Sequence, residues 1–326
     1  MPRILVTGGA GYIGSHTVHF LQKRGFDVTV VDNLSRGHEH NVQSVSFHRL
    51  NLLETDALAD LMSRGRFDAV IHFAAYIAVG ESTQKPELYF TNNVSGSISL
   101  FTAMERAGVN KLVFSSTAAV YGTPEDVPIL EDFPYAPLSP YGESKVMVEK
   151  ILGWLDQYRG LRSICLRYFN ACGSEPGSGL GEEHEPETHL IPLLFRAIDS
   201  GKPVTIFGED YPTPDGTCIR DYIHVSDLAE AHISSVEALL SGGLSNKFNA
   251  GTGVGRSVRE VMQAVEDVVG RKIPHVVGPR RAGDPAELVA NSDRLQTFLG
   301  WKPRYPDIRD IVRSAWDFYR QQTQKS

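Results

Sequence analysis

The chain has 326 residues, of which 41% are hydrophobic and 22% are charged, and its formal net charge is −7. This composition indicates a globular protein with a sizeable core, and the acidic balance excludes the basic field that nucleic-acid binding requires. No apolar run approaches the ~18 residues of a membrane span, and the sequence enters its first apolar strand without a signal peptide. We therefore expect a cytoplasmic protein whose partner is a small molecule rather than a nucleic acid or a membrane.

The residues that commonly bind metals are few and poorly spaced. Cys165, Cys172 and Cys218 are too irregularly placed for a disulfide framework or a zinc site, and the "HEH" of residues 38–40 lacks further ligands at a suitable spacing. We expect reduced, buried thiols and no metal.

The first half of the chain alternates short β-rich runs with longer helical patterns. This alternation predicts an α/β fold with a doubly wound parallel sheet, the Rossmann architecture. Beyond residue 170 the pattern loosens into Gly, Pro and acidic loops, which predicts a smaller mixed α/β substrate lobe over the carboxyl edge of the sheet. We expect domains at 1–170 and 171–326, with chain crossings between the two. The predicted strands are 3–8, 27–32, 45–50, 68–74, 111–116 and 162–169, with helices ending at Gly25, near 84–108 and starting from Tyr141.

A glycine-rich turn follows the first predicted strand. The stretch "VTGGAGYIGSH" places Gly8, Gly11 and Gly14 at a spacing that lets the backbone approach a pyrophosphate at the positive end of the next helix. Taken alone, the turn is also compatible with a tight strand–helix connection that binds nothing. The second strand ends at Asp32, about twenty residues further on, where a carboxylate accepts a hydrogen bond from a ribose 2′-hydroxyl and repels a 2′-phosphate. Residues 1–170 are therefore predicted to bind NAD rather than NADP.

The stretch "SPYGESK" puts Tyr141 and Lys145 one turn apart at a predicted helix start. A phenol has a pKa of about 10 and is a poor base at neutral pH unless nearby positive charge stabilises the phenolate. With Lys145 beside it, Tyr141 can take a proton from a substrate hydroxyl while hydride leaves the carbon. Ser115, Ser116 and Thr117, at the end of the strand "VFSST", offer hydroxyls to the same substrate oxygen. An isolated pair of this kind is usually an ordinary exposed helix pair, so the preceding nucleotide turn carries the functional interpretation.

With these residues the chain resembles the extended short-chain dehydrogenase/reductase superfamily and, in detail, its UDP-glucose 4-epimerases. The resemblance covers nearly the whole chain, through "TGGAGYIGSH", "VFSSTAAVYG", "YGESK", "LRYFNACGS" and the most specific block, "IFGEDYPTPDGTCIRDYIHVSDLA". It implies reversible epimerisation of UDP-glucose and UDP-galactose at C4 through a 4-keto intermediate, with tightly bound NAD, in galactose metabolism. It also implies a homodimer.

The resemblance implies a role for each matching residue. Tyr141 is the base, Lys145 binds the nicotinamide ribose and tunes the base, and Thr117 bonds the sugar oxygen. Besides Tyr141, Lys145, Asp32 and the three glycines, the residues implied around NAD are Tyr12, Ile13, Asn33, Asn51, Leu52, Phe73, Ala74, Ala75, Asn92, Ser115 and Phe169. Those implied at the UDP-sugar, besides Thr117 and Tyr141, are Asn170, Phe207, Arg220, Arg281, Asp284 and Leu288.

The chemistry of the substrate set agrees with these roles. Two arginines bind a diphosphate through charge-assisted hydrogen bonds, and a carboxylate accepts from a ribose. The alternative for Arg220 is a structural ion pair with its neighbour Asp221. Leu288 stands where some members have Tyr, and the smaller side chain leaves room for an N-acetyl group.

The sequence departs from the family pattern at three positions. Asn51 replaces the usual Asp beside the adenine amino group, although its amide oxygen is still an acceptor. Ile77 removes a lysine that some members have near the phosphates, and Thr117 replaces Ser while keeping the hydroxyl.

Several rival functions share these motifs. Nucleotide-sugar dehydratases have acidic residues directly after the strand-end Thr, whereas this chain has Ala118 and Ala119, which transfer no proton. A 4-epimerase of UDP-N-acetylglucosamine, a UDP-pentose or a UDP-uronic acid stays open, as does a non-catalytic NAD-binding sensor or scaffold. His72 and His224 flank apolar runs and are expected to be satisfied core histidines rather than acids.

Overall fold

The computed structural model describes residues 1–42, 44–281 and 283–324 and comprises two compact units. The first unit draws on three separate stretches, so the chain crosses between the units several times. The expected division at residue 170 stays a prediction. The first unit contains Met1–Gly122, Pro134–Arg167 and Ala229–Phe248, and the second contains Thr123–Phe133, Tyr168–Leu228 and Asn249–Ser326.

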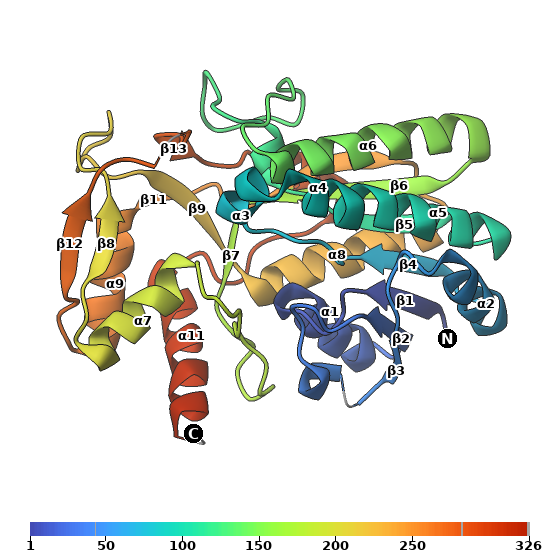
Figure 1. The fold of residues 1–326 in the computed structure, drawn as a ribbon, viewed down its shortest axis with the longest axis horizontal. Helices are drawn as coiled ribbons and strands as arrows, with labels where there is room; N and C mark the ends of the chain where they lie inside the picture. Colours follow the sequence, from blue (N-terminus) through green and yellow to red (C-terminus); the bar gives the residue numbers. More distant parts are fainter. Residues whose placement is uncertain (43, 282, 325–326) are drawn as a thin grey trace. The chain divides into compact units, whose positions relative to one another are not determined.

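Strands and helices alternate through the first half of the chain, as the sequence predicts (Figure 1). The elements up to residue 168 are β1 (Arg3–Thr7), α1 (Tyr12–Lys23), β2 (Asp27–Asp32), η1 (Glu39–Val42), β3 (Ser46–Arg49), α2 (Thr55–Gly65), β4 (Ala69–His72), α3 (Val79–Gln84), α4 (Pro86–Tyr89), η2 (Phe90–Ser95), α5 (Gly96–Arg106), β5 (Lys111–Ser115), η3 (Ala118–Val120), α6 (Pro140–Arg159) and β6 (Arg162–Tyr168). The later elements are β7 (Asn170–Cys172), α7 (Leu190–Ser200), β8 (Val204–Phe207), β9 (Ile219–His224), α8 (Val225–Leu240), β10 (Asn246–Ala250), β11 (Gly255–Ser257), α9 (Val258–Val269), β12 (His275–Gly278), β13 (Glu287–Leu288), α10 (Asp293–Leu299) and α11 (Ile308–Thr323).

The first unit is built on a sheet of order β10-β6-β5-β4-β1-β2-β3. β1 pairs in parallel with both β2 and β4, so the strand order reverses at β1. This confirms the doubly wound Rossmann prediction, and ligands of such sheets bind where the order reverses, outside the carboxyl ends of the strands. One face of the sheet packs against α2, α5 and α6 through a continuous apolar core that includes Leu5, Val70, Phe114, Leu58, Met62, Leu100, Phe101, Val148 and Leu152.

The helix that follows the Ser-Pro pair begins where the sequence predicts. Ser139 is its N-cap and accepts a hydrogen bond from the backbone N–H of Gly142 at 3.2 Å, and Pro140 occupies the first helical turn. The helix ends at Arg159 and is capped by Gly160, whose left-handed conformation (φ +67°) suits glycine. α6 is therefore fixed at both ends by local sequence, and its first turn holds Tyr141.

Two features of the first unit differ from the sequence predictions. The helix expected near 84–108 starts at Pro86 and contains a π-helical segment, Phe90–Ser95, and α2 was not predicted. The side chain of Asn93 holds the π segment, since it donates to the carbonyl of Tyr76 and to the hydroxyl of Ser144, both at 3.0 Å.

The second unit is a mixed α/β body, as expected for the smaller lobe. β9 pairs with β7, β11 and β13, and β8 pairs with β12. Its core is formed by α7, α9 and α11 around residues such as Leu194, Phe195, Val261, Val265 and Val312. Within the described part of the chain, no helix combines the length and the apolar composition needed to cross a bilayer.

Candidate active site

The glycine turn is shaped for close approach of a ligand to the backbone. A Cβ on Gly8 would lie 2.5 Å from the backbone nitrogen of Ala74, and one on Gly14 would lie 2.2 Å from the carbonyl oxygen of Gly8. Gly11 is different, because a Cβ there would meet that oxygen only at 3.4 Å and its φ of −80° suits any residue. The protein's own packing thus admits a side chain at Gly11. Because Gly11 has no side chain, the N-terminus of α1 is open, which fits a pyrophosphate.

Asp32 ends β2 beside this turn. Its two carboxylate oxygens accept hydrogen bonds from the backbone N–H groups of Ala10 at 3.0 Å and Leu34 at 2.8 Å. Burial raises the pKa of Asp32, while these backbone bonds act in the opposite direction. Each oxygen keeps a second lone pair, so the carboxylate can still accept from a ribose hydroxyl.

Other residues of the expected NAD set lie in the first unit at loops around the same strands. Phe73 and Ala74 follow β4 and donate their backbone N–H groups to the carbonyl of Thr7 at 2.8 and 3.1 Å. Asn92 lies in the π-helical segment, and the amide oxygen of Asn51 accepts from the backbone N–H of Leu53 at 3.0 Å. The family's adenine contact would therefore fall on an oxygen that already has one partner. The fit of the donor set to NAD rests on the turn and Asp32, and the individual contacts stay predictions.

Tyr141 and Lys145 lie on the same face of α6, and both are buried. The ammonium of Lys145 donates to the carbonyl of Ser115 at 2.8 Å and lies 4.8 Å from the centre of the Phe114 ring. Burial lowers the pKa of Lys145 to about 7, and the charge of Glu149 acts in the opposite direction. A buried pair of this kind, tied to the end of β5, contradicts the alternative of an exposed helix pair.

The hydroxyl residues after β5 have separate roles. Thr117 caps the short helix η3, where its Oγ1 accepts from the backbone N–H of Ala119 at 3.2 Å, and its own O–H is not used in that bond. Ser116 instead donates to Oε1 of Glu149 at 2.6 Å. The hydroxyl proton of Ser116 is thus used inside the protein, and its expected part in holding the substrate stays a prediction.

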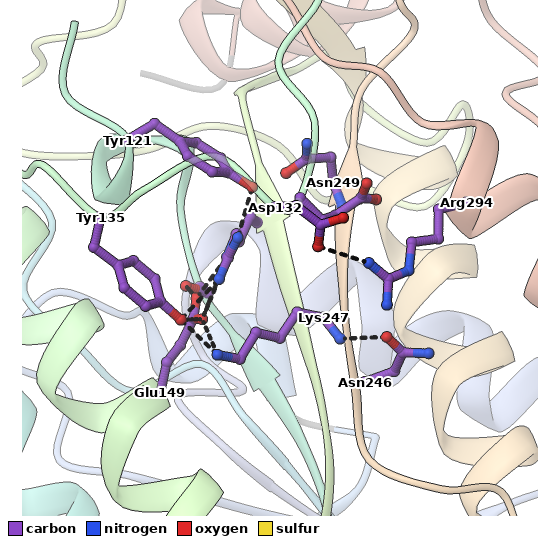
Figure 2. Close-up of polar contacts among 11 residues, drawn as sticks. Tyr121, Asp132, Tyr135, Glu149, Asn246, Lys247, Asn249 and Arg294 are labelled. Atoms are coloured by element: carbon purple, nitrogen blue, oxygen red, sulfur yellow. Dashed lines mark hydrogen bonds and ion pairs between the residues drawn. The ribbon is translucent and has the colours of Figure 1, made fainter. Parts of the chain in front are cut away.

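Glu149 was not predicted as a site residue, although it lies one turn beyond Lys145 on the same face of α6. Its carboxylate is buried and accepts from Arg167 Nη2 at 2.7 Å and from Tyr135 at 2.8 Å. Figure 2 shows the polar groups of Tyr135, Glu149 and Lys247 converging, with Tyr121 near them. The available sequence signal was the continuation of the four-residue spacing 141, 145, 149.

Several of the expected substrate residues of the second unit lie on or beside β9. Arg220 on β9 is buried, and its guanidinium donates to a carboxylate oxygen of Asp284 and to the carbonyl of Pro285 at 2.7 Å. The guanidinium carbon of Arg281 lies 4.1 Å from the centre of the Phe207 ring. Leu288 on β13 is half-buried and pairs with Arg220 in the parallel register of β13 and β9.

The alternative of an ion pair between Arg220 and Asp221 is wrong. Asp221 accepts hydrogen bonds from Thr252, from the backbone N–H of Gly253 at 2.9 Å and from that of Ala290 at 3.2 Å. It therefore holds two loops in place. Arg220 pairs with Asp284, a residue of the expected substrate set.

The two histidines that flank apolar runs are core residues, as expected. His72 hydrogen-bonds to Thr7 Oγ1 at 2.7 Å and Ser97 Oγ at 2.9 Å, and burial together with the charge of Lys145 lowers its pKa to about 3. His224 hydrogen-bonds to Ser314 Oγ at 3.0 Å and accepts from the backbone N–H of Ser226 at 3.1 Å.

The three cysteines are free thiols, two buried and Cys218 half-buried. Among the described residues, one group of side chains has the spacing of metal ligands and was not predicted. It consists of Glu182, His184 and His189. The two histidines hydrogen-bond to carboxylates instead, His184 to Glu182 and His189 to Glu187 at 2.8 Å. Although burial lowers the pKa of His189, its bond to Glu187 and the charge of Glu182 raise it to about 9 overall. Both imidazoles of this group are thus hydrogen-bonded to carboxylates.

Known proteins resemble this chain over nearly its whole length. The model of the NAD dependent epimerase/dehydratase family matches residues 4–251. The chain is 48% identical over 319 residues to a UDP-glucose 4-epimerase of Halalkalibacterium halodurans, covering 98% of this chain and 96% of that protein. It superposes with a TM-score of 0.95 on a UDP-glucose 4-epimerase of Brucella ovis in complex with NAD, at 43% identity and 98% coverage of both chains. A UDP-glucose 4-epimerase of Stenotrophomonas maltophila with bound NAD and formylated UDP-arabinopyranose gives a TM-score of 0.96, at 39% identity and full coverage of both chains.

The matched residues include the glycine turn, Asp32 and the buried pair of Tyr141 and Lys145. On this evidence the chain belongs to the NAD dependent epimerase/dehydratase family.

Proposed function

We propose that the protein interconverts UDP-glucose and UDP-galactose by inverting C4 through a 4-keto intermediate, with NAD kept bound, in galactose metabolism. The observation that carries this proposal is the pair of Tyr141 and Lys145, buried on one face of α6 with Lys145 bound to the strand end that precedes Thr117. Bound NAD would supply hydride acceptance and return. Conversion of UDP-galactose to UDP-glucose by the purified protein tests the proposal, and also separates it from a non-catalytic NAD sensor or scaffold.

The residues of the first unit suit proton transfer at a secondary alcohol. Tyr141 takes the proton of the C4 hydroxyl and returns it, the ammonium of Lys145 favours the phenolate, and Thr117 donates a hydrogen bond to the sugar oxygen. Ala118 and Ala119, which lie in η3, offer no acid for the elimination of water. This favours epimerisation over dehydration.

We assign the UDP group to the second unit. Arg220 and Arg281 suit a diphosphate, with Asp284, Asn170 and Phe207 as further contacts. In this assignment the UDP group is the fixed part of the substrate and the hexose is held only through Thr117 and Tyr141. A 4-keto sugar can then turn over between the loss and the return of hydride.

Isotope labelling tests this retention directly. Substrate deuterated at C4 should give the epimer with the label still at C4, without exchange into solvent or into added free NAD. Unlabelled substrate in D2O is the mirrored control and should gain no deuterium at C4. Free NADH that accumulates in proportion to product would instead indicate an ordinary dehydrogenase.

The range of sugars depends on Leu288, which lies beside Arg220 in the sheet of the second unit. We propose that this side chain admits UDP-N-acetylglucosamine as a second substrate. Leu288→Tyr should then lower kcat/KM for the acetylated sugar by roughly tenfold or more, because a bulky side chain excludes the extra group, and should change UDP-galactose turnover little. Leu288→Met, which conserves volume, is the matched control. The proposal fails if the unmodified protein does not act on the acetylated sugar, or if both sugars lose equally.

We also propose a cytoplasmic homodimer. The dimer is supported by large apolar side chains that are exposed on α5 and α6, among them Ile98, Met147 and Trp154. Sedimentation of the purified protein tests the oligomeric state.

A further inference from the structure

Glu149 lies at the centre of a buried polar network that joins α6 to three other parts of the first unit. It binds Ser116 after β5, Tyr135 in the segment before α6, and Arg167 on β6. The side chains of Glu149 and Arg167 are 0% and 2% exposed. A helix residue with this many partners fixes the register of α6 against the sheet.

The contact with Ser116 matters most for the reacting groups. Ser116 lies between Ser115, whose carbonyl receives the ammonium of Lys145 at 2.8 Å, and Thr117, the expected sugar contact. Ser116 in turn donates to Glu149 at 2.6 Å. Two bonds therefore tie the strand end to α6, one through Lys145 and one through Glu149. Loss of the bond through Glu149 removes one of these two ties between the strand end that precedes Thr117 and the helix that carries Tyr141.

The positive charges around Glu149 outnumber its single negative charge. Its Oε2 lies 2.7 Å from Arg167 Nη2 and 3.6 Å from Lys247 Nζ, and Lys145 lies one turn away on the same helix. One buried carboxylate thus faces three cations. Arg167 stays protonated in a protein, and Lys247 is 40% exposed, so water screens its charge. Lys145 is the group that loses its proton most easily if the carboxylate is removed.

The pKa shifts of Glu149 and of the groups around Lys145 agree with this arrangement of charges. Burial raises the pKa of Glu149, but the bonds and charge of Arg167 outweigh it and hold the value below its usual range. The other groups that face Lys145 are His72 on β4, which is neutral, Phe114 and the carbonyl of Ser115 on β5, and Cys165 on β6, whose thiol has a raised pKa. Glu149 is therefore the only carboxylate in this set of neighbours among the described residues.

We propose that Glu149 is a positioning residue for the reaction, which binds the strand end through Ser116 and keeps Lys145 in its ammonium form. The kinetic part of this inference rests on the proposed function, whereas the charge of Lys145 is measurable without any substrate. Glu149 touches neither substrate nor cofactor in this role and acts through Lys145 and the strand end.

The first test follows Lys145 directly. In protein labelled with 13C at the lysine ε carbons, the Lys145 signal is assigned from its loss in Lys145→Met, and its titration midpoint is measured. Glu149→Gln should move the midpoint to lower pH, because a negative charge that favours the ammonium has been removed. Ser116→Ala keeps every charge and should leave the midpoint in place. An unchanged midpoint in Glu149→Gln would overturn the proposal.

The second test is kinetic. Glu149→Gln should lower kcat near pH 7 by about 10- to 100-fold with little change in KM, as expected for misplaced reacting groups. As pH rises, the activity of Glu149→Gln should also fall at a lower pH than that of the parent, because Lys145 loses its proton earlier. Leu58→Ala, a core truncation in α2 outside the network, is the control for lost stability. If Glu149→Gln loses activity only in proportion to its folded fraction, as this control should, the residue is merely structural.

The double variant Glu149→Gln/Arg167→Met serves if Glu149→Gln alone does not fold. It removes both charges of the buried pair, which proteins tolerate better than the loss of one partner. Its Lys145 midpoint should lie nearer to that of the parent than the Glu149→Gln midpoint does. Where only the double variant folds, its midpoint should lie below that of the parent and above the value for a Lys145 side chain with no charged neighbour. If the parent shows no epimerase activity, the proposed function fails, and the Lys145 midpoints still decide the role of Glu149.

Discussion

Replacing Tyr141 with Phe should reduce turnover by about 10²–10⁴-fold, the usual contribution of a general base, while the protein keeps its fold and its NAD. The substitution removes one oxygen from a buried ring at the start of α6 and leaves its apolar contacts in place. Steady-state rates with UDP-galactose, measured beside the NAD content of the purified variant, check both parts of this expectation.

Tyr158→Phe is the matched control for that experiment. Tyr158 is on the same helix, but it is 70% exposed and stacks on Trp154 with ring centres 5.9 Å apart. Its loss of a hydroxyl should leave turnover unchanged. A Tyr141→Phe protein that turns over at the parent rate would exclude Tyr141 as the base.

The parts of the site that follow from local sequence were predictable. The glycine turn and Asp32 are set by the spacing of a strand, a turn and a helix, and the start of α6 is set by Ser139 and Pro140. Such signals act over a few residues and do not depend on the rest of the fold. Tyr141 and Lys145 were predicted for the same reason.

The features that were missed depend on distant contacts. α2 has no glycine just after its last turn and ends at Arg66 in the left-handed conformation (φ +51°), so the usual end signal is absent. The π segment depends on Asn93 and its bonds to Tyr76 and Ser144, which the sequence does not show. Tertiary contacts thus hold the π segment, whereas α2 was missed because its end signals are weak.

Glu149 shows the limit most clearly. A glutamate inside a helical pattern is normally solvated, and only its contacts with Ser116 and Arg167 reveal that it is buried. The ion-pair partner of Arg220 was likewise not readable from the sequence, because its neighbour in sequence is Asp221 but its partner is Asp284. Adjacent charges suggest ion pairs, whereas strand geometry sends the side chains of neighbouring residues to opposite faces.

Replacing Lys145 with Ala should remove most of the turnover and also weaken the retention of NAD, since we assign both tasks to one side chain. The ammonium is the donor to the carbonyl of Ser115 and the buried positive charge beside Tyr141. Without it the phenolate form of Tyr141 is less favoured, and the nicotinamide ribose loses a donor. NAD content after gel filtration and single-turnover rates with saturating added NAD measure the two losses separately.

Lys145→Met fills the space that Ala leaves and separates lost packing from lost charge. The folded chain holds Lys145 at a pKa of about 7, below its ordinary 10.5, so between these values the unfolded chain binds more protons. The parent should therefore gain stability as pH rises through this window, and Lys145→Met should lack that contribution. Denaturant titrations of both proteins at pH 7 and pH 9.5 measure the difference. If Lys145→Met retains parental turnover and NAD, neither task needs the charge. If the stability of the two proteins depends on pH in the same way, Lys145 is not held away from its ordinary pKa.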